Sequence, residues 1–144
     1  MLLLLLQFLL GMAVNLFVTI PAHHPGSQAS NYFVGVFQSV VWAISHGTLT
    51  LALHTVLGLL LVLSSIGVLS GAIRRRRRGL IIVAALGLVG IMAAGFNGGS
   101  FLVFGKSYSS MLMSVGFAIA VAGYAVGLSL MAALQVSVSQ TSND

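Results

Sequence analysis

Four long runs of apolar residues, separated by short polar stretches, dominate the chain. They cover residues 2–20, 33–73, 79–96 and 111–134. A transmembrane helix needs about 20 predominantly apolar residues to cross ~30 Å of hydrocarbon. The pattern therefore predicts an all-α fold, a bundle of four transmembrane helices over about 2–20, 46–73, 79–96 and 111–134, followed by a polar tail over 135–144.

The second run is too long for a single crossing. A helix of membrane length that ends at Ile73 begins near His54, about 20 residues earlier. Residues 33–45 then either extend this helix beyond the hydrocarbon or form a separate interfacial helix, where Trp42 is a typical residue. Gly47 is the expected break point, because glycine disfavours helix.

The composition agrees with a membrane protein. Of 144 residues, 58% are hydrophobic and 5% are charged, and the mean hydropathy is +1.11. Soluble domains are about 25% charged, so lipid is the expected outer solvent of residues 1–134, a single integral membrane domain. The chain has no cysteine, and Asp144 is its one acidic residue. Thiolate metal sites and catalytic carboxylate pairs are excluded, which favours a protein that is not an enzyme.

Five of the six basic residues lie in one run between the second and third spans. They are Arg74, Arg75, Arg76, Arg77 and Arg78. Basic residues in short loops stay on the cytoplasmic side, so this loop and both termini are expected in the cytoplasm of a multi-pass plasma (inner) membrane protein. The arginines are also expected to contact anionic lipid headgroups. Nucleic acid is not an expected partner, because two spans hold the run at the membrane surface.

This topology places the polar groups of the spans and loops in the outer half of the membrane domain. The set comprises His23, His24, His46, His54, Asn97, Ser100, Lys106 and Tyr108. Imidazole binds haem iron and copper, so haem b is the first candidate cofactor and copper the second. His54 is the best axial ligand because it lies deepest, and His46, His23 and His24 are the other candidates. A copper site would use His23, His24 or His46, with the thioethers of Met111 and Met113.

Small residues indicate where helices approach closely. Gly116, Ala120, Gly123 and Gly127 form one smooth face of the fourth span, and Gly67 and Gly71 form a pair in the second. These faces either hold the bundle together or dock another subunit. Asn15 is expected to make an interhelical hydrogen bond. Asn97-Gly98-Gly99 predicts a turn that begins an outer loop reaching Ser110.

Two functions follow from these observations. The first is a small integral membrane subunit or binding module, accessory to a larger complex, which holds haem b or a metal ion through its outer histidines. The alternative is a small oligomeric transporter or channel-like protein with a polar outer vestibule. In both cases the expected partners are lipid and either further copies of this chain or other subunits of a membrane complex.

Overall fold

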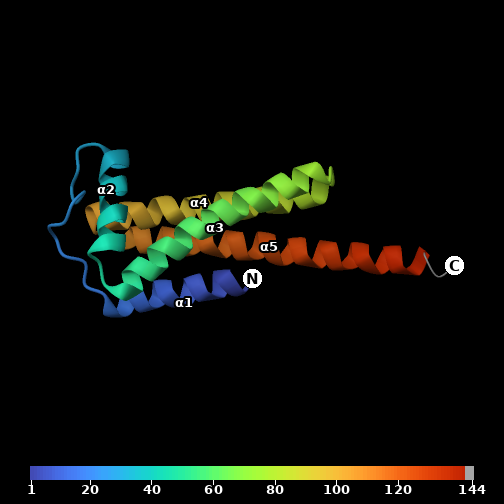
Figure 1. The fold of residues 1–144 in the computed structure, drawn as a ribbon, viewed down its shortest axis with the longest axis horizontal. Coiled ribbons are helices and arrows are strands. Elements are labelled where there is room, and N and C mark those ends of the chain that lie inside the picture. The colour runs from blue at the N-terminus through green and yellow to red at the C-terminus, as the bar shows by residue number, and fades with distance from the viewer. Residues whose placement is uncertain (142–144) are drawn as a thin grey trace.

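The structure, a computed structural model, describes residues 1–141 as five helices without strands, which confirms the all-α prediction. Side chains are described for residues 1–135. The helices are α1 (Leu2–Phe17), α2 (Tyr32–Ser45), α3 (Leu49–Arg74), α4 (Arg78–Phe104) and α5 (Ser107–Thr141). In Figure 1, α1, α3, α4 and α5 run roughly along the length of the molecule, and α2 lies across one end. We call this end the α2 end and the opposite one, at Arg74–Arg78, the arginine end.

Three of the helices are long and apolar enough to cross a membrane. They are α3, α4 and α5, and only 11 to 28% of the residues in their most apolar windows are buried. The apolar side chains therefore cover the outside of the molecule, as expected where lipid is the solvent. The first run forms a shorter helix than expected. α1 has 16 residues, about 24 Å, and begins part-way along the bundle beside α3 (Figure 1).

The long second run is divided into two helices at the expected glycine. α2 ends at Ser45 and α3 begins at Leu49, so Gly47 lies between them. The Thr48 hydroxyl accepts a hydrogen bond from the Leu51 amide at 3.3 Å, and Asn31 caps α2 in the same way through Val34. These caps satisfy amides that have no partner within the helix. Residues 33–45 thus belong to a separate helix and do not extend α3.

The turn predicted at Asn97-Gly98-Gly99 is wrong, because α4 continues through these residues to Phe104. The Asn97 side-chain amide donates to the Ala93 carbonyl at 2.8 Å, one helical turn earlier. Gly99 is buried against α2, where a Cβ would lie 3.0 Å from Val36. The chain instead turns at Gly105, whose left-handed φ of 64° suits glycine.

α4 and α5 pack with their backbones in direct contact. A Cβ added at Gly90 would lie 2.6 Å from the Gly116 carbonyl oxygen and 2.6 Å from the Ala120 amide nitrogen. Nearby, Leu4, Leu61, Ile91 and Ala120 form a buried layer that joins α1, α3, α4 and α5. This layer divides the interior into one part toward the α2 end and another toward the arginine end.

Candidate functional site: a polar pair in the cavity at the α2 end

A cavity of about 300 Å³ lies between α1, α3, α4 and α5 toward the α2 end. This volume is at the lower end of the range for small-molecule sites. Most of its lining is apolar, and its polar side chains are Gln7, Asn15, His54, Thr55, Ser110 and Ser114. Phe8 and Met12 of α1 line it and remain 47% and 42% exposed, so the cavity opens to the outside along α1.

Gln7 and His54 form a polar pair in the wall of this cavity. The Nε2 atoms of the two side chains are 3.4 Å apart and join α1 to α3. Two glycines make room for them. A Cβ at Gly11 would lie 3.0 Å from Cε1 of His54, and a Cβ at Gly58 would lie 3.3 Å from Nε2 of Gln7. The local sequence of both helices therefore allows the pair to sit between their backbones.

The pair leaves one hydrogen-bond donor and one acceptor without partners. Nε2 of Gln7 can only donate, so Nε2 of a neutral His54 accepts and Nδ1 carries the proton. Nδ1 of His54 and Oε1 of Gln7 are both buried and have no hydrogen-bond partner. If the amide of Gln7 is flipped, its oxygen accepts from Nε2 of His54, and one donor and one acceptor of the pair still lack partners. Such unpaired groups cost about 1–3 kcal/mol each, which marks the pair as a place where a polar partner would be stabilising.

A second contact joins α1 to α5 at the rim of the cavity. Ser110 donates to Oδ1 of Asn15 at 3.3 Å, which confirms the interhelical hydrogen bond predicted for Asn15. The rings of Phe8 and Phe117 stack with centroids 5.9 Å apart on the same side. Side chains thus join α1 to α5 at these two points, while the backbones of α4 and α5 touch directly.

The other histidines do not join His54 in this cavity. His24 stacks on Trp42 with centroids 4.4 Å apart, and its Nδ1 and Nε2 lie 3.0 Å and 3.1 Å from the carbonyl oxygens of Pro25 and Leu102. His46 is exposed, with Nδ1 at 2.7 Å from the Ser45 hydroxyl, and His23 is exposed as well. Within residues 1–141, no three His, Cys, Asp or Glu residues are grouped as metal ligands would be.

The remaining candidates from the sequence occupy three different environments. Met113 lines the cavity, whereas Met111 is 67% exposed. The small residues predicted to form one face of α5 are buried against α4. Gly116, Ala120 and Gly123 contact the α4 backbone, and Gly127 contacts the side chain of Val83. A Cβ at Gly67 or Gly71 would meet nothing within 4 Å, so these two glycines lie on a face of α3 that no described residue covers.

Sequence reasoning did not single out Gln7 or Tyr124. Gln7 interrupts a run of leucines in α1, and this lone amide was the available signal. Tyr124 lines a second cavity, of about 330 Å³, toward the arginine end.

No protein family model, curated protein or solved structure matches the chain, so no function carries over from a relative.

Proposed function

We propose that this chain is a small integral membrane binding module that holds one uncharged, mostly apolar molecule in the cavity at the α2 end. The observation that carries the proposal is the buried pair of Gln7 and His54, which leaves one donor and one acceptor unpaired in the wall of a mostly apolar cavity. A ligand with a hydroxyl or carbonyl group at one end would satisfy these atoms after a small side-chain rotation. Its apolar body would fill the remaining space.

The topology that we propose keeps the arginine end in the cytoplasm. Short basic loops stay inside, and Arg74–Arg78 are all exposed. α3, α4 and α5 then cross the plasma membrane, α1 inserts beside α3 as the fourth membrane helix, and α2 lies along the outer interface. The end of α5 then lies inside, while α1 begins part-way along the bundle with its first residues toward the cytoplasmic side (Figure 1).

A binding module is favoured over a transporter or channel by the buried layer in the middle of the bundle. Leu4, Leu61 and Ile91 line both cavities and are only 4 to 7% exposed. A polar solute would have to cross these apolar side chains, so a single copy offers no continuous polar path. The open face at Gly67 and Gly71 supports an accessory role, because small residues let a neighbouring subunit approach closely.

Haem b, which we predicted from the sequence as the first candidate cofactor for His54, remains the alternative ligand. The axial nitrogen would have to be released from Gln7, because Nε2 of His54 faces that side chain. Copper has less support, because His23, His24 and His46 lie outside the lining of the cavity. These differences make the proposed ligand and haem distinguishable in one experiment.

The test is to identify what copurifies with the chain. Protein extracted in mild detergent would be analysed by visible absorption, elemental analysis and mass spectrometry of the released small molecules. We expect one uncharged molecule per chain in the parent protein, its loss in His54→Leu and Gln7→Leu, and its retention in the control His46→Leu. Equal retention in His54→Leu, or no bound molecule in the parent, would refute the proposal. A Soret band that is present in the parent protein and absent in His54→Leu would mean that the bound molecule is haem b.

A further inference from the structure

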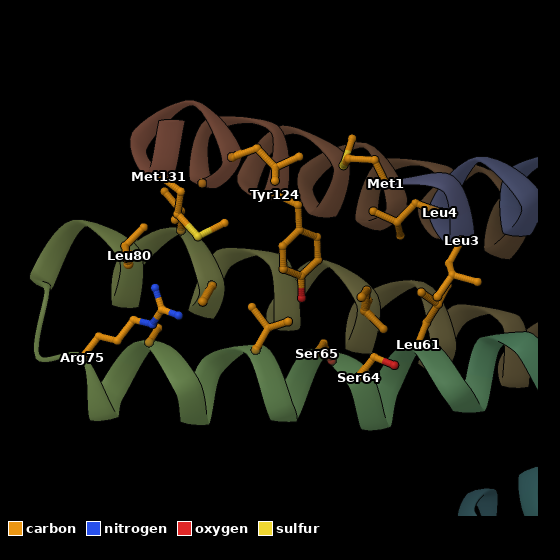
Figure 2. A pocket seen from close by; sticks show the side chains of 17 residues that line it. Met1, Leu3, Leu4, Leu61, Ser64, Ser65, Arg75, Leu80, Tyr124 and Met131 are labelled. Atoms are coloured by element: carbon orange, nitrogen blue, oxygen red, sulfur yellow. The ribbon is translucent and has the colours of Figure 1, made fainter. Parts of the chain in front are cut away.

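The cavity toward the arginine end has the form of a groove between α3 and α5. Figure 2 shows Arg75 near one end, Tyr124 in the middle, and Met1 and Leu4 at the other end. Leu80, Val83 and Ala84 of α4 line it as well. Val68 and Leu128 belong to its lining and are 50% and 49% exposed, so the groove opens to the outside along its length.

The lining of this groove is mostly apolar, and its one charged side chain lies near one end (Figure 2). Arg75 is the one charged side chain among the described residues that line it, and Ser64, Ser65 and Tyr124 are the other polar ones. The Ser65 hydroxyl is already used, since it donates to the Val62 carbonyl at 2.7 Å. A molecule that fits this surface is apolar over most of its length and negatively charged at the end beside Arg75.

The dimensions agree with one leaflet of a membrane. Leu61 lies fourteen residues before Arg75, which is about 21 Å along the helix axis. Half of a bilayer, measured from the headgroup region to the midplane, is about 20–22 Å. An acyl chain that starts at the headgroup level of Arg75 would therefore reach the buried layer of Leu4 and Leu61, where the groove ends.

The charge at the arginine end has no counterion in the described chain. Arg74–Arg78 are exposed, and Asp144, the sole acidic residue of the sequence, lies outside the described residues. Arginine binds phosphate through paired hydrogen bonds, and a basic cluster at a membrane surface attracts anionic lipid at about 1 kcal/mol per residue. We propose that the groove holds one acyl chain of an anionic phospholipid whose phosphate is bound by Arg75 and its neighbours. This inference rests on the proposed topology but not on the ligand of His54.

The experiment measures lipid binding to the delipidated full chain in detergent. Phosphatidylglycerol and phosphatidylcholine would be titrated separately, with retained lipid counted by native mass spectrometry. We expect one tightly held phosphatidylglycerol and no comparable phosphatidylcholine. Val68→Phe should weaken binding roughly tenfold by filling the groove. Its control is Leu63→Phe, on the same helix at a residue that is 66% exposed and does not line the groove.

A second pair of variants separates the groove from general attraction by charge. Arg75→Gln should weaken binding about tenfold, because it removes both the charge and the paired hydrogen bonds at the groove. Arg77→Gln removes only a charge, which is worth about fivefold. Equal binding to Val68→Phe and Leu63→Phe, or equal binding of the two lipids, would overturn the proposal. His54→Leu should keep the lipid, so the two proposals can fail separately.

Discussion

The close approach of α4 and α5 makes Gly90 the position where a single methyl group should do most damage. The Cβ of an alanine there would lie 2.6 Å from both the Gly116 oxygen and the Ala120 nitrogen. Comfortable contacts between such atoms are about 3.5–4.0 Å, so the helices must move apart by about 1 Å. Both clashing atoms belong to backbone, which cannot rotate away as a side chain can.

The expected cost of Gly90→Ala is about 3 kcal/mol, at the upper end of the range for overpacked cores. In a membrane, lipid offers apolar contacts as readily as another helix, so close packing supplies much of the attraction between helices. Moving α4 and α5 apart would also loosen the contact at Gly116, where a Cβ would lie 2.7 Å from the Ala94 amide nitrogen. The loss therefore extends over the whole crossing.

Gly95→Ala is the matched control, because it lies on the same helix and an added Cβ meets nothing within 4 Å. Both substitutions change intrinsic helix propensity equally, so this contribution cancels. The free energy of unfolding would be measured by SDS titration in mixed micelles. We expect Gly95→Ala to be as stable as the parent protein or up to about 1 kcal/mol more stable, because alanine favours helix and the added methyl group meets nothing. A difference below ~0.5 kcal/mol between the two variants would refute the backbone contact.

Three further predictions test the α2 end and its turns. His24→Ala should shift Trp42 emission by removing the stacked ring, whereas His23→Ala should not; an unchanged spectrum would contradict the stack. Gly105→Ala should lower the free energy of unfolding in SDS titration by about 1–2 kcal/mol, because φ at this position is 64°. Gly105→Asn should lower it less. Equal stability of the parent protein and both variants would contradict a left-handed conformation at this turn. A double-mutant cycle of Asn15→Ala and Ser110→Ala should give a coupling of about 0.6 kcal/mol, and strict additivity would exclude their hydrogen bond.

The sequence was sufficient to predict where the helices lie but not where all of them end. The break at Gly47 could be predicted, since a run of that length cannot cross once. The end of α4 could not, because Asn97-Gly98-Gly99 has the composition of a turn. Its glycines instead serve close packing, with Gly99 against Val36 of α2, a contact that only the folded arrangement creates.

Only one of the two residues of the polar pair could be predicted from the sequence. His54 stood out as the deepest imidazole, and the structure places it in the wall of a cavity. Its partner Gln7 is 47 residues away, and their meeting depends on how far α1 is shifted along α3. That register is set by packing around Gly11 and Gly58, which no local pattern specifies.

The tail expected over 135–144 begins within α5, and residues 142–144 lie outside the described part of the chain.

The orientation of α2 has a consequence for how the cavity is filled. α2 lies across one end of the bundle (Figure 1). Val40 of α2 and Ile20 of the preceding loop line the cavity on that side. A molecule from the aqueous phase therefore meets covered helix ends, while one dissolved in the bilayer meets the seam beside Phe8 and Met12. For the ligand that we propose, the membrane would then be the reservoir. Occupancy should follow the mole fraction of ligand in the lipid, and an affinity expressed per volume of buffer will change with the amount of lipid or detergent in the sample.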